Sequence, residues 1–224
     1  MNLKDLNLLK ENLPDFPGIH GRERLFNSAV LIPLIIKNDE LHFIFEKRAE
    51  GIRQGGEICF PGGAYELQHD NSCKDTALRE TSEELGIPAK NITMIGQMNT
   101  VIAAMGAAIE PFIGIIENIS PEDFNIQKNE VKKIFSVPVS WFLENNPEIY
   151  NVVLEIKPYE EDEKGARKIL LPAKELGLPK RYHNSWGHFK HRVLVYRVQG
   201  ERIWGLTAEI VNAFINLSPN TKKS

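Results

Sequence analysis

The stretch Glu57–Ile87, EICFPGGAYELQHDNSCKDTALRETSEELGI, decides which fold we expect for this chain. Its second half predicts a helix over residues 72–85. Each of residues 70–72 has a side chain that can cap the first turn, and Gly86 and Pro88 stand where a helix should end. The sequence therefore predicts the order strand, loop, helix, followed by more strands.

Three glutamates crowd one side of this predicted helix. At about 100° per residue, Glu80, Glu83 and Glu84 fall within one narrow arc. Each like-charged pair at this spacing costs about 0.2–0.5 kcal/mol, and the negative end of the helix dipole lies close by. Arg79 neutralises only part of this charge, so we expect a divalent cation such as Mg²⁺ or Mn²⁺ to compensate the rest. The alternative is a solvated face on a surface helix.

A glycine turn before the helix favours the metal site over the solvated face. The segment Phe60–Gly63 (FPGG) ends an apolar run, and paired glycines let the backbone approach a ligand closely. Together with Arg79–Ile87 (RETSEELGI), this turn resembles the Nudix box, the loop and helix of enzymes that hydrolyse a nucleoside diphosphate linked to another group. The family pattern has an acidic residue six positions after the glycine, where this chain has His69, and Asp70 follows it.

This resemblance implies a fold and a metal site. The fold is α/β, a Nudix-type α/β/α sandwich with a mixed β-sheet, formed here as a single domain over residues 1–224. Arg79 has a structural role, because its guanidinium orients the glutamates through charge-assisted hydrogen bonds. The implied ligands of Mg²⁺ or Mn²⁺ are the carbonyl of Gly62 and the carboxylates of Glu80, Glu83 and Glu84.

The resemblance also implies which carboxylates take part in catalysis. Hydrolysis of a diphosphate needs neutralised phosphates and a water made nucleophilic near neutral pH. Glu80 and Glu83 are the candidates on the helix, and Glu80 is able to accept the proton of the water. In Nudix enzymes a carboxylate just before the strand that here ends in Pro138 completes the site, which points to Glu130 and, behind it, to Glu110. An ordinary surface glutamate is the alternative for Glu130.

The segment ahead of the glycine turn narrows the substrate. Arg48, the pair Ile52-Arg53 and the pair Gly56-Glu57 resemble the motif that precedes the Nudix box in the coenzyme A diphosphatase branch. The resemblance implies cleavage of coenzyme A or acyl-coenzyme A into 3′,5′-ADP and (acyl-)4′-phosphopantetheine. Arg48 and Arg53 then bind substrate phosphates, although two solvated arginines are the alternative. Later segments resemble the same branch in the same order, namely Glu110–Gly114, Asn129–Pro138 and Trp204–Ala208.

Three other functions stay open. A Nudix hydrolase of ADP-ribose or of another nucleoside diphosphate derivative has the same glutamate helix. A non-catalytic binding module has the fold without the reaction. An enzyme of the isopentenyl diphosphate isomerase type needs a catalytic cysteine, and Cys59 lies in a strand pattern where a structural role is the usual one.

Composition points to a small-molecule enzyme in a reducing compartment. With 224 residues and 42% apolar content, the chain can bury one substantial core. A net charge of −3 provides no basic surface for nucleic acid or for an anionic membrane. Cys59 and Cys73 have neither metal-binding nor redox spacing, which predicts free thiols and a cytoplasmic location. The N-terminal segment lacks the features of a secretory signal.

The rest of the chain predicts a helical cap, a sheet and a long insertion. The cap covers residues 1–20, with an amphipathic helix over residues 2–13. The insertion covers residues 158–190, and a substrate lid or a homodimer contact would explain it. The nearby His183, His188 and His191 are interpreted as loop histidines, since their spacing suits zinc poorly. We expect strands at residues 29–36, 41–46 and 57–60, a strand pair within 94–116, a hairpin over 191–204, and a last helix over 207–217 capped by Thr207.

Overall fold

The computed structural model describes residues 10–14 and 18–217. The chain forms two compact units, which we describe separately. The first unit comprises Met1–Ile35 and Phe60–Val131, and the second comprises Ile36–Cys59 and Lys132–Ser224. The expected single domain stays a prediction. Most of the expected N-terminal helix over residues 2–13 lies outside the described residues.

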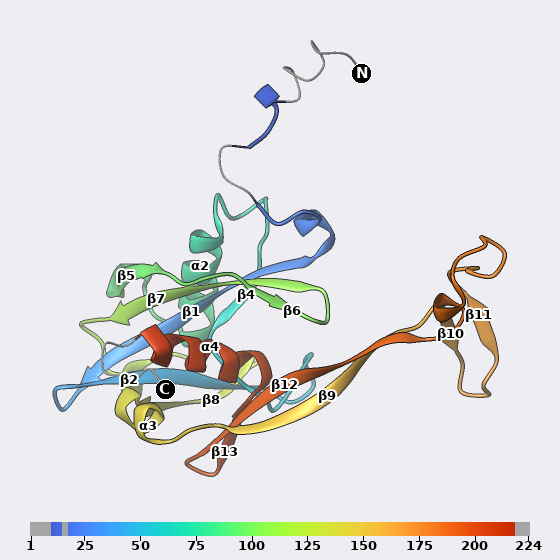
Figure 1. The fold of residues 1–224 in the computed structure, drawn as a ribbon. Coiled ribbons are helices and arrows are strands. Elements are labelled where there is room, and N and C mark those ends of the chain that lie inside the picture. Colours follow the sequence, from blue (N-terminus) through green and yellow to red (C-terminus); the bar gives the residue numbers. More distant parts are fainter. Residues whose placement is uncertain (1–9, 15–17, 218–224) are drawn as a thin grey trace. The chain divides into compact units, whose positions relative to one another are not determined.

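The first unit is built on a mixed sheet (Figure 1). Strand β1 (Phe26–Lys37) pairs in parallel with β7 (Ala107–Ile116) and antiparallel with β4 (Gly62–Ala64). Strands β5 and β6 both pair antiparallel with β7. Parallel and antiparallel neighbours in one sheet confirm the predicted mixed α/β architecture. The remaining elements of this unit outside the helix described next are η1 (Arg22–Arg24), η2 (Ala89–Asn91), β5 (Ile92–Gln97), β6 (Val101–Ala103) and η3 (Pro121–Asp123).

The apolar segment within residues 94–116 forms strands, as expected. It contributes most of β5 and all of β6 and β7. No helix in the described part of the chain has both the length and the apolar character needed to cross a membrane.

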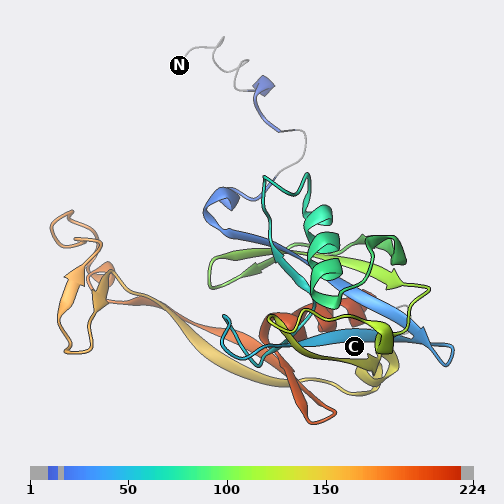
Figure 2. The ribbon, with the colours of Figure 1, turned by 180° about the vertical axis from the view of Figure 1, so that it is seen from behind.

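Helix α2 (Cys73–Leu85) confirms the helix predicted from the sequence. The Ser72 hydroxyl accepts a hydrogen bond from the Asp75 N–H, and Gly86 ends the helix in the left-handed region with φ 63°. The helix buries Thr81 and Leu85 and packs on β4 and β7, as Figure 2 shows from behind. This packing sets α2 beside the glycine turn.

The second unit has a core of aromatic side chains. Strand β2 (Glu40–Arg48) pairs with β3 (Ile58–Cys59) and with β8 (Val131–Pro138), and helices α3 (Val139–Glu144) and α4 (Gly205–Leu217) contact each other. The Phe43 ring is fully buried, with its centroid 4.9 Å from that of Phe214 and 5.4 Å from that of Phe142. These edge-to-face contacts join β2 to both helices.

A long antiparallel ribbon extends from this unit. Strand β12 (Trp186–Val198) pairs with β9 (Glu148–Ile156) on one side and with β13 (Glu201–Trp204) on the other. Cross-strand partners share a face of the sheet. One face of the ribbon therefore has Tyr150, Val152, Leu154, Ile156, Phe189, His191 and Val193, and the opposite face has Ile149, Val153 and Leu194 beside Lys190 and Arg192.

The insertion contains more structure than the sequence predicted. Strands β10 (Tyr159–Glu161) and β11 (Arg167–Ile169) form a small hairpin, and the short helix η4 (Lys180–Tyr182) follows. Residues 186–190, expected to be irregular, belong to β12.

The predicted start of the last helix is wrong. Helix α4 begins at Gly205, so Thr207 lies inside its first turn. The Thr207 hydroxyl donates a hydrogen bond to the Ile58 carbonyl at 3.2 Å, which ties α4 to β3. The hydroxyl is therefore an anchor within the second unit.

Candidate active site

For steric reasons, only glycine fits at position 62, the first of the two glycines in the turn. Gly62 has φ 154°, and a Cβ added there would lie 2.3 Å from the Ala29 carbonyl oxygen. The Gly62 N–H donates a hydrogen bond to Glu84 Oε2 at 2.8 Å. Glu84 is only 3% exposed, so this carboxylate is buried against the turn. The helical arc grouped Glu84 with Glu80 and Glu83 on the anionic side of the helix, and the structure shows that Glu84 is buried.

Gly63 leaves room for a second glutamate. A Cβ added at Gly63 would lie 2.4 Å from the Glu80 carboxylate carbon. The side chain of Glu80 therefore occupies the space that any larger residue at position 63 would fill. Both glycines bring the turn against glutamates of α2.

Asp70 supplies the acidic partner of Arg79. Its carboxylate accepts hydrogen bonds from Arg79 Nε at 3.0 Å and from Arg79 Nη2 at 3.1 Å. The Thr76 hydroxyl and the Glu66 N–H donate to the same carboxylate. The guanidinium, together with these donors, lowers the pKa of Asp70 to about 2. His69 lies at the surface near Glu66, so the insertion in the loop moves the acidic role to Asp70.

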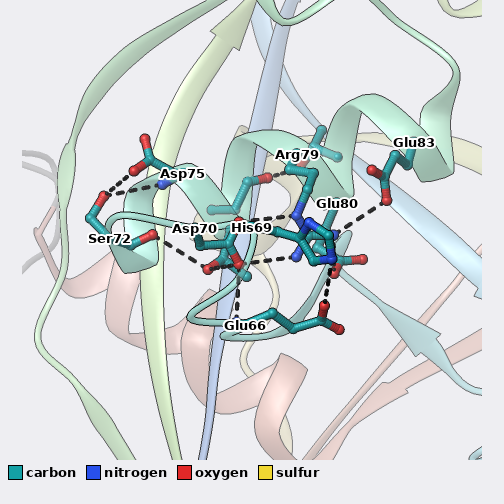
Figure 3. A network of polar contacts seen from close by, with 11 residues as sticks. Glu66, His69, Asp70, Ser72, Asp75, Arg79, Glu80 and Glu83 are labelled. Atoms are coloured by element: carbon teal, nitrogen blue, oxygen red, sulfur yellow. Dashed lines mark hydrogen bonds and ion pairs between the residues drawn. The ribbon is translucent and has the colours of Figure 1, made fainter.

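Arg79 also holds two glutamates of the predicted metal site (Figure 3). Its Nη1 lies 2.8 Å from Glu80 Oε1 and 3.3 Å from Glu83 Oε2. The guanidinium thus joins the buried loop carboxylate to the exposed end of the cluster. The structural role of Arg79 stays a prediction, and in this geometry its guanidinium contacts both carboxylates.

Negative charge is concentrated around Glu80. Burial raises the pKa of Glu80, Arg79 opposes that rise, and the nearby charges of Glu83 and Glu130 raise it further. Glu130 lies in the turn before β8, where Gln127 Nε2 donates to its Oε1 at 3.2 Å. The structure therefore brings Glu130 into the electrostatic neighbourhood of the helix glutamates.

The residues present fit a hard divalent cation in their donor chemistry. Carboxylate oxygens are the ligands that Mg²⁺ and Mn²⁺ prefer, and the repulsion around Glu80 is the kind that a cation relieves. In residues 10–14 and 18–217, no three His, Cys, Asp or Glu side chains already converge as a complete metal site. The Gly62 N–H and the Arg79 guanidinium hold the carboxylates instead.

The two arginines predicted to bind substrate lie in the second unit. Arg48 ends β2, and its Nε donates a hydrogen bond to the Arg53 carbonyl oxygen at 3.1 Å. The structure therefore brings Arg48 to the loop that carries Arg53.

Cys59 lies in the second unit as well, and its thiol donates a hydrogen bond to Glu46 Oε1 at 3.1 Å. Both cysteines of the chain are free, as predicted.

Glu110, the second choice for a carboxylate beside the site, has a different environment. It is 3% exposed and forms an ion pair with Arg22. Gln97 Nε2 and the Thr100 hydroxyl both donate to its Oε2, at 2.7 Å and 2.9 Å. These partners anchor η1, β5 and β7 to one another, which is a structural role.

Comparison with known proteins identifies the family. A family model described as the NUDIX domain matches residues 26–181, which is more than half of the chain. The chain belongs to the Nudix family. Its fold is the α/β sandwich of that family, and it is a Nudix pyrophosphohydrolase.

Individual relatives of this Nudix hydrolase are similar at modest identity. The peroxisomal coenzyme A diphosphatase NUDT7 of Mus musculus is 32% identical over 125 residues, which cover 54% of this chain and 50% of the mouse protein. The uncharacterized Nudix hydrolase NudL of Yersinia enterocolitica is 28% identical over 187 residues, covering 83% of this chain and 77% of that protein. An Ap4A hydrolase structure from C. elegans aligns with a TM-score of 0.42 and 16% identity, over 50% of this chain and 80% of that one.

Family membership has two general consequences. Nudix enzymes act on small nucleoside diphosphate derivatives, and they generally need divalent metals. The glutamates around the glycine turn are the residues of this chain whose chemistry suits that requirement.

The replacement Asp70→Asn should destabilise the protein in a pH-dependent way. Loss of the carboxylate charge should lower the free energy of unfolding at pH 7 by about 1–3 kcal/mol. Because folding lowers the pKa of Asp70 from 3.8 to about 2, its contribution is complete above pH 4 and is lost as the pH falls toward 2. Urea denaturation between pH 7 and pH 2 measures the difference. A difference in the free energy of unfolding between wild type and variant that stays constant over this range would contradict the assignment. Asp123→Asn is the surface control.

The replacement Gly63→Ala should impair turnover more than folding. The added methyl group would overlap the Glu80 carboxylate, whose carbon lies 2.4 Å from the ideal Cβ position, and force it to move. Displacing a reacting group by about 1 Å costs up to about 100-fold in rate. Steady-state kinetics on a nucleoside diphosphate substrate should show this drop in kcat. Gly96→Ala is the matched control, because nothing lies within 4 Å of its Cβ position; equal kcat values for the two variants would refute the prediction.

Proposed function

We propose that this Nudix hydrolase cleaves the diphosphate linkage of coenzyme A or acyl-coenzyme A. The products would be 3′,5′-ADP and (acyl-)4′-phosphopantetheine. The observation that carries the proposal is the 32% identity over 125 residues to a mouse coenzyme A diphosphatase. The resemblance of Arg48, Ile52-Arg53 and Gly56-Glu57 to the motif of that branch supports it independently of overall identity.

The carboxylates of α2 would hold the metal. Glu80, Glu83 and Glu84, with the Gly62 carbonyl, are the proposed ligands of Mg²⁺ or Mn²⁺. When bound, such a cation supplies charge neutralisation for the diphosphate and a water of lowered pKa. Arg79 keeps Glu80 and Glu83 oriented, because it is itself held by the buried Asp70.

A carboxylate near the metal ligands must then accept the proton of the attacking water. Glu130 is our proposal for that role. Glu80 is paired with Arg79 at 2.8 Å, whereas the partner of Glu130 is the neutral amide of Gln127. A carboxylate whose partner is a neutral amide can accept a proton without breaking an ion pair. Glu83, 54% exposed in its side chain, would act as a ligand at the open end of the cluster.

A substrate panel tests the function. Purified protein is incubated with coenzyme A, an acyl-coenzyme A, ADP-ribose and diadenosine tetraphosphate, with Mg²⁺, with Mn²⁺ or with a chelator, and the products are separated and identified. We expect metal-dependent release of 3′,5′-ADP from coenzyme A. Turnover of ADP-ribose with no cleavage of coenzyme A would refute the substrate assignment and leave the Nudix chemistry in place. No metal-dependent turnover of any substrate would instead favour a binding module.

The replacement Glu130→Gln should lower kcat with little effect on stability. Loss of a general base typically costs about 10²–10⁴-fold in rate. A surface glutamate of the same unit, Glu122, provides the control Glu122→Gln. If both variants keep the wild-type kcat, the proton acceptor is a different residue.

A further inference from the structure

The second unit contains a cavity of about 500 Å³ that the proposed reaction does not explain. Strands β12 and β13 form one wall, to which β9 adds Tyr150. The end of β2 and the loop before β3 form the other wall, with Lys47 and Gly55–Glu57. The cavity is therefore lined by a three-stranded sheet and by a glycine-containing loop.

The sheet register places two arginines directly opposite each other in this cavity. Arg197 of β12 and Arg202 of β13 are cross-strand partners, so their side chains leave the same face of the sheet. Both residues line the cavity. Like charges directly opposite each other destabilise a sheet. Negative charge near both guanidinium groups would relieve this repulsion.

The carboxylates of the unit compensate only part of this charge. Glu148 pairs with Arg197, with Arg197 Nη2 3.2 Å from its Oε2. The carboxylate of Glu201 forms ion pairs with Lys47 Nζ at 2.9 Å and with Lys133 Nζ at 2.8 Å. Two cations therefore share one carboxylate. Within the described residues, no ion pair involves Arg202.

An aromatic ring lies beside the two arginines. Trp204 is the cross-strand partner of Val195, two residues along from the arginine pair and on the same face. Its side chain lines the cavity and is 46% exposed, which leaves ring surface for a ligand. Tyr150 lines the cavity too, although its hydroxyl donates a hydrogen bond to Glu148. Glu57, on the facing loop, disfavours an anion on its own side, so an anionic ligand must lie toward the arginines.

We propose that this cavity binds a phosphorylated nucleoside, with the phosphomonoester on Arg197 and Arg202 and the base stacked on Trp204. Guanidinium groups bind phosphate through paired, charge-assisted hydrogen bonds. Indole rings stack on any nucleic-acid base, because every base has a π-face. Such a ligand has two sources, which are the adenosine 3′-phosphate part of a coenzyme A substrate and a separate nucleotide. The site requires no hydrolysis, so it stands independently of the proposed function.

Isothermal titration of adenosine 3′,5′-bisphosphate in the presence of EDTA tests the site, since the chelator removes metal-dependent binding elsewhere. The replacement Arg202→Gln should raise Kd by about tenfold or more. Arg202→Lys should bind with intermediate Kd, because lysine keeps the charge without the planar fork. Trp204→Leu should weaken the bisphosphate and leave inorganic phosphate unaffected. Arg181→Gln, an arginine of the same unit outside the cavity, is the control.

A thermal measurement separates binding from a structural role. Relief of the Arg197–Arg202 repulsion should leave the Tm of ligand-free Arg202→Gln equal to or above that of the wild type. At one ligand concentration, the bisphosphate should raise the Tm of the wild type more than that of the variant. The proposal is overturned if the wild type does not bind the bisphosphate, or if Arg202→Gln and Trp204→Leu both bind it within twofold of the wild type.

Competition identifies the source of the ligand without any catalytic readout. Displacement of the bisphosphate by coenzyme A, and not by 3′-dephospho-coenzyme A, would assign the site to the substrate. Binding that persists under saturating coenzyme A would assign it to a separate nucleotide. Both results support the cavity as a nucleotide site. An enzyme that fails to cleave coenzyme A still gives a clear answer in this assay.

Discussion

Asp70 lies in the loop before α2 with its carboxylate removed from water, a position that a charged group tolerates only with several partners. The partners are two nitrogens of Arg79, the Thr76 hydroxyl and the Glu66 N–H. They fix the loop against the helix and fix Arg79 in one orientation. Arg79 in turn holds Glu80 and Glu83. The arrangement of the candidate active site therefore depends on an ion pair that itself takes no part in the proposed reaction.

Much of this site was accessible from sequence, because its signals are local. Capping by Ser72, termination at Gly86 and the glycine turn all follow from short-range rules, and the structure agrees with each. The partner of Arg79 was harder to predict, because an insertion in the loop puts His69 at the expected position and only the folded loop shows that Asp70 is buried instead. The burial of Glu84 was also hidden, since a helical arc does not reveal that a backbone N–H lies against one part of it.

The second unit was less predictable, because its features depend on partners far apart in the chain. Strand β12 begins at Trp186, inside a segment whose glycine and charges suggested irregular structure, and its partners in β9 lie 30 or more residues earlier in the chain. Thr207 looked like a helix cap, yet Gly205 already begins the helix and Ile58 accepts the hydroxyl hydrogen. Likewise, the meeting of Arg197 and Arg202 follows only from the register of the hairpin. Single-sequence patterns contain no direct record of such register.

The contact between Glu84 and the Gly62 N–H has a thermodynamic consequence for ligand capture. A carboxylate that is already desolvated and immobile in the folded chain loses little rotational freedom when a cation arrives, and it sheds few waters at that moment. Much of the unfavourable entropy of assembling the site is therefore incurred during folding. The exposed Glu83 has the opposite character, and as a proposed ligand it would have to be ordered when the cation binds. The proposed cation site would therefore combine a preorganised half with an adaptable half.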